Sequence, residues 1–314
     1  MPKITLNCGC SVAETFVDFI ASRKSRGLAD KTINSYEGQF KGIARFLDVS
    51  QDIDALQKSD LDRMIAGMRD YGLAPNTIAS YVRILKSFLS WCNEEGITQL
   101  NIKLYKGEET IKETYSDAEL DLLLTKPDLR KCSFVEYRCW VITNFLLNSG
   151  SRAATIRAIQ IRDVDLENSI IYYRHTKNRK TQAIPLCSQM VTVLREYLRF
   201  RRGEPTDYLF CAENGDQLTE SALRQSMARY NRQRGVQKTS LHLFRHTFAR
   251  KYLVDCGGNA FTLQKLLGHS TLAMTKHYCA IFDADITKNF DQFSPLEKMK
   301  SSSGKIKMRK GKSS

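Results

Sequence analysis

The stretch Gly27-Leu-Ala-Asp-Lys-Thr-Ile-Asn-Ser-Tyr36 recurs 45 residues later as Gly72-Leu-Ala-Pro-Asn-Thr-Ile-Ala-Ser-Tyr81, with seven of ten positions identical. In each copy the glycine is expected to end one helix, and Asp30 or Asn76 to cap the next one. Amphipathic stretches at residues 12–25 and 60–71 precede the two copies. The pattern predicts four helices from a duplicated helical hairpin. Because two copies are too few for a stacked repeat array, it favours a closed bundle.

A change of pattern marks the end of this first domain, which we place at residues 1–98. Residues 99–115 lose helical periodicity and carry many charges, which predicts a linker. Ser116 and Glu119 then have the spacing of a capping box and are expected to open the first helix of a second domain, residues 116–294. Residues 295–314 are rich in Ser, Gly and Lys and predict a disordered basic tail.

The second domain is expected to be mainly helical, with a small β-hairpin. Two strands, residues 169–175 and 181–186, flank a polar turn that contains Lys177, Arg179 and Lys180. Helices are expected on both sides of this hairpin, at residues 116–124, 138–148, 153–161, 188–202, 219–234, 243–256 and 261–267. The fold class is therefore mainly α with a small β-hairpin or sheet, in two domains.

The charge is strongly basic, with 48 Lys plus Arg against 34 Asp plus Glu and a formal net charge of +14. The first hundred residues carry 12 basic and 12 acidic side chains, residues 101–294 carry 29 and 21, and residues 295–314 carry 7 and 1. The excess therefore lies in the second domain and the tail. It permits a polyanionic partner without identifying one.

The location of the protein is also constrained by its sequence. No run approaches the roughly 18 apolar residues of a membrane span, and the N-terminus lacks the pattern of a signal peptide. The nine cysteines form no CxxC pair, so neither a disulfide framework nor structural zinc is expected. These features predict a cytoplasmic protein.

Histidines and arginines gather late in the chain. Four of the five histidines fall between residues 241 and 278. In Leu241-His-Leu-Phe-Arg-His246, the spacing of three places His242 and Arg245 on one helical face. His242 and His246 have the spacing of a zinc pair, but this stretch lacks the Glu of a metalloprotease helix and any third ligand of obvious spacing.

The remaining polar groups indicate metal-free phosphate chemistry. Arg152 follows a tight turn at Gly150, and Tyr278 follows His269 by nine residues. The sequence shows neither a carboxylate pair for metal ions nor a phosphate-binding glycine loop. Guanidinium groups can hold nonbridging phosphate oxygens, a cation can protonate a leaving oxygen, and a phenol can attack phosphorus.

Over residues 11–294 this set resembles the tyrosine recombinase (phage integrase) family. The matching motifs are Ser149-Gly-Ser-Arg152, the hairpin lysine eight residues before Pro185, His242-Leu-Phe-Arg-His246, Leu267-Gly-His269, and the tyrosine nine residues beyond His269. The resemblance implies an N-terminal core-binding (SAM-like) domain and a mixed α/β catalytic domain, joined by the linker into a clamp around double-stranded DNA. The catalytic residues that it implies are Arg152, Lys177, His242, Arg245, His269 and Tyr278.

By the same resemblance, Tyr278 attacks a scissile phosphate and forms a 3′-phosphotyrosine, with no metal or ATP. Lys177 is favoured over Lys180 as general acid because of its spacing from Pro185. The implied assembly is a homotetramer on two duplexes, with possible accessory DNA-bending proteins and a nucleoid location. A segment such as residues 283–293 typically docks on a neighbouring protomer.

Two positions depart from the family's pattern. Thr155 stands where a supporting Glu or Asp is usual, and Phe244 replaces the common Leu before Arg245. The leading expectation is a site-specific recombinase that integrates or excises a mobile element. The alternatives are Xer-like chromosome dimer resolution, DNA inversion, a type IB topoisomerase, and a DNA-binding regulator without catalysis.

Overall fold

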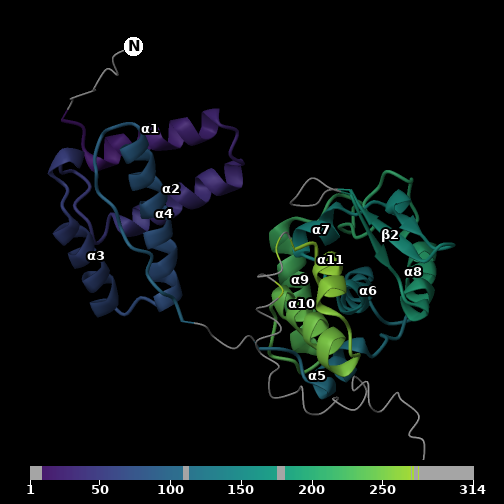
Figure 1. Cartoon of the computed structure of the whole chain (residues 1–314). Helices are drawn as coiled ribbons and strands as arrows, with labels where there is room; N and C mark the ends of the chain where they lie inside the picture. The colour runs from purple at the N-terminus through teal and green to yellow at the C-terminus, as the bar shows by residue number, and fades with distance from the viewer. Residues whose placement is uncertain (1–8, 109–112, 175–180, 270, 272–274, 276–314) are drawn as a thin grey trace, which may run out of the picture. The chain divides into compact units, whose positions relative to one another are not determined.

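The computed structural model describes residues 9–108, 113–174, 181–269, 271 and 275. The chain forms two compact units that divide near residue 110 (Figure 1). Each unit has its own apolar core. Among the described residues, no helix combines the length and the hydropathy that a membrane span requires.

The first unit is the four-helix arrangement that the repeat predicts. Its helices are α1 (Val12–Ser25), α2 (Asp30–Ile43), α3 (Lys58–Asp70) and α4 (Pro75–Glu94), and a 3₁₀ turn, η1 (Ile53–Ala55), precedes α3. The core is aromatic: the rings of Phe16 and Phe40 stack with centroids 3.7 Å apart, and Phe88 packs edge-on against Phe16 at 5.4 Å.

The helix boundaries correct one expectation about the repeat. Gly27 and Gly72 follow α1 and α3 with φ of 75° and 82°, as expected for glycines after a helix end. The residues at the caps of α2 and α4, however, are Ala29 and Ala74, and neither cap has a side-chain hydrogen bond. Asp30 and Asn76 lie inside the helices, so the prediction that they are N-caps was wrong. An acidic side chain in the first turn of α2 still favours the helix through its dipole.

The two ends of the stretch predicted to be a linker belong to different units. Ile102 is buried in the core of the first unit, and Tyr105 packs against that core. Tyr115 is buried in the core of the second unit. Its backbone N–H donates to Oγ1 of Thr247, 2.9 Å away.

The second unit is built around helix α6 (Phe134–Ser149), which lies between α8 (Ser188–Arg201) and α10 (Leu241–Arg250) in Figure 1. Helix α6 packs against α5 (Asp117–Leu124), α8, α9 (Glu220–Gln233) and α10. The Ser116 capping box is confirmed, because Oγ of Ser116 accepts from the Glu119 N–H and the Glu119 carboxylate accepts from the Ser116 N–H.

A three-stranded antiparallel sheet lies beside these helices, in the order β1 (Val164–Asp165), β2 (Ile170–Tyr173), β3 (Gln182–Pro185). Strands β2 and β3 confirm the predicted hairpin, whereas β1 was not expected. The predicted helix at residues 153–161 is shorter, because α7 (Ala153–Ala158) gives way to a 3₁₀ turn, η2 (Ile161–Asp163).

The last described helices carry the candidate motifs. Helix α10 continues into a π-helical segment, η3 (Lys251–Asp255), and α11 (Ala260–Leu267) follows. Gly268 ends α11 in the left-handed conformation with φ of 61°.

Candidate active site

A tight turn between α6 and α7 places Arg152. Helix α6 ends at Ser149, and its C-cap residue is Gly150, whose φ of 59° is left-handed. A Cβ added to Gly150 would lie 2.5 Å from Cδ1 of Phe248 and 2.8 Å from Cδ2 of Leu267. Arg152 is the N-cap residue of α7 and is half-buried. The turn therefore needs glycine both for its conformation and for the close approach of α10 and α11.

Arg245 lies on α10. Its guanidinium connects its own motif, residues 242–246, with the motifs at residues 149–152 and 267–269. Its side chain is buried, with 3% of the residue exposed. Nη1 donates to the carbonyl oxygen of Gly150 at 2.9 Å, and Nη2 donates to that of Leu267 at 2.9 Å. Nη2 also lies 2.7 Å from Nε2 of His269. The guanidinium is thus fixed by the α6–α7 turn, the end of α11 and the histidine that follows it.

The two arginines share a backbone acceptor. Nη1 of Arg152 donates to the Leu267 carbonyl oxygen at 3.3 Å, the same atom that accepts from Arg245. This carbonyl lies at the C-terminal end of α11, where the helix dipole places partial negative charge. Two guanidinium groups therefore lie close together beside a backbone oxygen.

The contacts of His269 fix its protonation. An arginine has only donors, so Nε2 of His269 must accept from Arg245 and Nδ1 carries the proton. Nδ1 lies 2.8 Å from Oγ1 of the buried Thr275, which is its hydrogen-bond acceptor. Burial lowers the pKa of His269 to about 4, and the positive charges of Arg245 and Arg152 add to this effect. The imidazole is neutral at pH 7. No motif in the sequence marks Thr275.

His242 lies in the first turn of α10 and is exposed. Its backbone N–H is capped by Oγ of Ser240 at 3.3 Å, and its ring centroid lies 5.4 Å from that of the buried His246. Across the described part of the chain, no three His, Cys, Asp or Glu side chains form a group suited to a metal ion.

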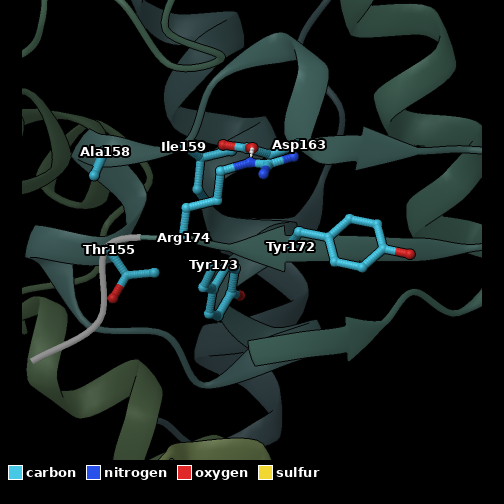
Figure 2. A pocket seen from close by; sticks show the side chains of 7 residues that line it. All are labelled: Thr155, Ala158, Ile159, Asp163, Tyr172, Tyr173 and Arg174. Carbon is cyan, nitrogen blue, oxygen red and sulfur yellow. Dashed lines mark hydrogen bonds and ion pairs between the residues drawn. The ribbon is translucent and has the colours of Figure 1, made fainter. Parts of the chain in front are cut away.

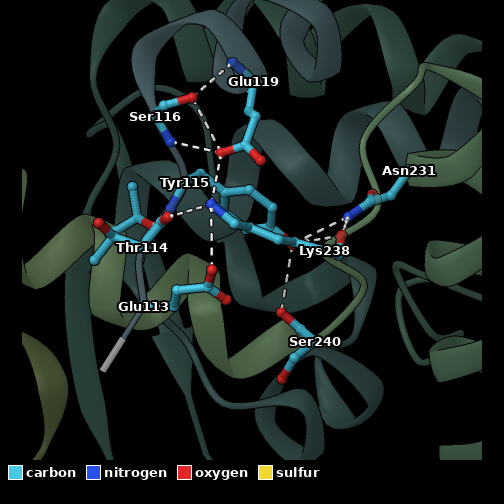
Figure 3. Close-up of polar contacts among 9 residues, drawn as sticks. Glu113, Thr114, Tyr115, Ser116, Glu119, Asn231, Lys238 and Ser240 are labelled. Atoms are coloured by element: carbon cyan, nitrogen blue, oxygen red, sulfur yellow. Dashed lines mark hydrogen bonds and ion pairs between the residues drawn. The ribbon is translucent and has the colours of Figure 1, made fainter. Parts of the chain in front are cut away.

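A polar cluster around Lys238 anchors the segment that leads into α10 (Figure 3). Nζ of Lys238 donates to the carboxylate of Glu119 and to the backbone oxygen of Thr114, each at 3.0 Å. Burial of Glu119 opposes ionisation, but hydrogen bonds from Ser116 and Lys238 lower its pKa overall. The Asn231 amide donates to the Lys238 carbonyl at 2.7 Å and to the hydroxyl of Tyr115 at 3.0 Å. These contacts fix the residues just before His242 and Arg245.

Thr155 lines a small pocket between α7 and the sheet, together with Asp163 and Arg174 (Figure 2). Asp163 is buried, and its Oδ1 accepts from Nε of Arg174 at 2.6 Å. Its Oδ2 accepts from the backbone N–H of Gln160 at 2.9 Å. A buried carboxylate therefore lies in the pocket that Thr155 lines.

The structure brings four of the six candidate residues into the second unit. Arg152, Arg245 and His269 converge on the Leu267 carbonyl region, and His242 lies one turn before Arg245. Lys177, its rival Lys180 and the candidate nucleophile Tyr278 lie outside the described residues, as does the predicted docking segment 283–293. What the described part can do is hold an anion with two fixed guanidiniums.

Comparisons with known proteins define the class. The sequence model of the Phage integrase family matches residues 115–284, and that of its N-terminal SAM-like domain matches residues 14–96. The chain therefore belongs to the phage integrase family of tyrosine recombinases, enzymes that cut and rejoin DNA.

Relatives and solved structures agree with this assignment. The chain is 25% identical over 297 residues to the tyrosine recombinase XerD of Staphylococcus haemolyticus, covering 91% of this chain and 99% of the relative. It shares the fold of the Tn1549 transposon integrase in complex with a circular intermediate DNA, with a TM-score of 0.73, 21% identity, and coverage of 85% and 94% of the two chains. Lambda integrase, solved as a tetramer bound to a Holliday junction, gives a TM-score of 0.70 at 17% identity, with 87% and 78% covered.

Proposed function

We propose that this protein is a site-specific DNA recombinase that acts on double-stranded DNA through a 3′-phosphotyrosine intermediate. The observation that carries the proposal is the fixation of Arg245 by the Gly150 carbonyl, the Leu267 carbonyl and His269. These contacts join three motifs far apart in the sequence into one anion site. A buried, immobile guanidinium suits a transition state whose charge lies on nonbridging phosphate oxygens.

The proposed reaction is a transesterification. The Tyr278 oxygen forms a bond to phosphorus, and the bond from phosphorus to the 5′ oxygen breaks. His242 takes the phenol proton, and Lys177 gives a proton to the departing 5′ oxygen. A 5′-hydroxyl from a partner duplex then attacks the phosphotyrosine and reverses these steps. The energy of the broken bond is retained in the protein–DNA linkage, so the cycle balances without a nucleotide cofactor.

His269 has a supporting role in this scheme. With Nε2 accepting from Arg245 and Nδ1 bonded to Thr275, it orients the guanidinium that contacts the phosphate. Because its imidazole is neutral, it adds no third positive charge beside Arg152 and Arg245. Arg152 supplies the second guanidinium.

The proposed assembly is a homotetramer on two duplexes, aided by accessory DNA-bending proteins at the nucleoid. The support is the shared fold with lambda integrase, whose solved form is a tetramer on a Holliday junction. The Tn1549 integrase was likewise solved with DNA.

A suicide substrate tests the nucleophile. A duplex nicked just 3′ of the scissile phosphate loses a short 5′-hydroxyl strand on cleavage, which traps the protein on the DNA. Wild-type protein should form the covalent adduct on the 3′ side, and Tyr278→Phe should not. If Tyr278→Phe forms the adduct as well as wild type, the assignment of the nucleophile is wrong.

A sulfur substitution tests the general acid. In a 5′-bridging phosphorothiolate substrate, the 5′ sulfur leaves as a thiolate and needs no proton. This substrate should therefore restore cleavage to Lys177→Ala. If the sulfur substrate restores cleavage to Lys180→Ala but not to Lys177→Ala, Lys180 is the general acid.

The proposed biological role is integration and excision of a mobile element, for which the fold shared with the Tn1549 transposon integrase is the support. Xer-type dimer resolution is the second candidate, because the XerD relative matches along almost its entire length. Recombination assays on the repeats flanking the gene and on chromosomal dimer sites distinguish the two. Relaxation of supercoils by a monomer without strand exchange would instead indicate a topoisomerase.

A further inference from the structure

The last described pair of the β2–β3 hairpin is Tyr173 and Gln182. The two residues lie directly opposite each other, so their side chains share one face of the sheet. The next pair on that face, Ile171 and Ile184, is buried in the core of the second unit. The segment between Tyr173 and Gln182 contains both lysines that compete for the general-acid role.

Tyr173 begins a chain of three hydroxyl groups that ends on α6. Oγ of Ser149 donates to the Phe145 carbonyl at 2.7 Å, so it must accept from Oγ of Ser151, also at 2.7 Å. Ser151 has then used its only proton and accepts from the hydroxyl of Tyr173. Burial raises the pKa of Tyr173 to about 12, so the donor stays protonated at neutral pH.

These hydrogen bonds connect the β2–β3 hairpin to the turn that places Arg152. Ser149 and Ser151 flank Gly150. The side chains of Ser149, Ser151 and Tyr173 are all buried. The turn itself is held independently, because the Gly150 carbonyl accepts from Arg245. Loss of the Tyr173 hydroxyl should therefore loosen the base of the hairpin and leave the turn in place.

Gln182 ties the other strand to the end of α11. Its Nε2 contacts the backbone carbonyl oxygens of Lys265 and Leu266, the latter at 3.0 Å. Carbonyl oxygens only accept, so the amide nitrogen must face them. The neighbouring carbonyl, that of Leu267, accepts from both arginines.

We propose that Tyr173 and Gln182 are positioning residues for the lysine on the hairpin. One holds the hairpin's base to the Arg152 turn, and the other holds it to the α11 end beside the arginines. The inference rests on the proposed function and adds to it two described side chains, Tyr173 and Gln182, on which the activity of the general acid would depend. Neither side chain needs to touch DNA in this role.

The preceding pair supplies a matched control. Tyr172 lies opposite Ala183 and faces away from this side of the sheet, as Figure 2 shows for the two tyrosines. Tyr172→Phe removes the same atom as Tyr173→Phe, one residue away on the same strand. Gln182→Met keeps the length of the side chain and removes its amide, and because Gln182 is only half-buried this variant tests the proposal if Tyr173→Phe folds poorly.

The experiment measures single-turnover cleavage of the suicide substrate by the full chain, with DNA affinity and thermal stability measured in parallel. Tyr173→Phe and Gln182→Met should each cleave about tenfold more slowly at unchanged DNA affinity, because small displacements of a catalytic group are costly. On the 5′-phosphorothiolate substrate both should return to the wild-type rate. Tyr172→Phe should match wild type on both substrates.

Three results would overturn the inference: wild-type cleavage by both variants, equal slowing on the oxygen and sulfur substrates, or equal slowing by Tyr172→Phe. Each is distinct from failure of the proposed function, which would appear as an adduct that survives Tyr278→Phe.

Discussion

A single imidazole links the electrostatics of the site to the stability of the protein. His269 is 9% exposed and lies against Arg245, and Arg152 adds to the positive field. Protonating it would place a third positive charge among buried groups. The folded protein therefore binds this proton only near pH 4, whereas the unfolded chain binds it near pH 6.5.

We predict an acid-sensitive contribution to folding from His269. Its pKa is lower in the folded state, so the stabilisation is complete above pH 6.5 and is lost as the pH falls toward 4. The loss should be roughly 1 to 3 kcal/mol. Urea unfolding at pH 7.5 and pH 5 measures it. His269→Gln should flatten this part of the profile. An unchanged slope in His269→Gln would contradict the assignment.

At Arg245 we predict that charge alone does not suffice. Arg245→Lys keeps the charge but cannot reach the Gly150 carbonyl, the Leu267 carbonyl and His269 together. Adduct formation should fall at least about 100-fold. Arg250→Lys, at an exposed position on the same helix, is the control. Wild-type cleavage by Arg245→Lys would show that the fork geometry is unimportant.

At the scale of elements, the α6–α7 turn concentrates several constraints in four residues. Gly150 supplies the left-handed conformation, its carbonyl holds Arg245, and the serines on either side join the hydroxyl chain from β2. The turn also starts α7 at Arg152. A change at Gly150 should therefore disturb both the packing and the chemistry.

We predict that Gly150→Ala destabilises the second unit by more than about 2 kcal/mol, through backbone strain together with overpacking. The added methyl would meet Phe248 and Leu267 at a φ of 59°. Gly215→Ala is the matched control, because its φ is 91° but nothing lies within 4 Å of the added Cβ. The difference in unfolding free energy between the two variants isolates the steric part, and equal losses would refute it.

Much of this element-level structure could be predicted from the sequence. The repeat and the 3.6-residue periodicity predicted α1 to α4, and the alternation of residues predicted the β2–β3 hairpin. The missed features depend on distant partners. Strand β1 is two residues long and exists only through its pairing with β2, and the role of Tyr173 depends on Ser151, 22 residues earlier. Local patterns carry no information on such pairs.

At the scale of the whole molecule, the positive charge is unequally shared. The first hundred residues are balanced, with 12 basic and 12 acidic side chains. Residues 101–294 carry an excess of eight, and residues 295–314 an excess of six. The tail lies beyond the proposed catalytic residues in the sequence.

We predict that truncation after Pro295 weakens DNA binding and makes it less dependent on salt. Each lost phosphate contact should lower the slope of log K against log salt by about 0.9. Adduct formation at saturating protein should remain. Binding measured across a salt series checks the slope, and loss of the covalent adduct would show that the tail has a catalytic part.

The Leu267 carbonyl at the end of α11 affects the arrangement of the two arginines before any DNA is bound. Bringing two guanidinium groups together is unfavourable, and a backbone oxygen between them offsets part of that repulsion. The cost of bringing Arg152 and Arg245 together is therefore met when the protein folds. Under the proposed function, a phosphate would contact two guanidinium groups that are already in place, so these two side chains would lose little conformational entropy on binding.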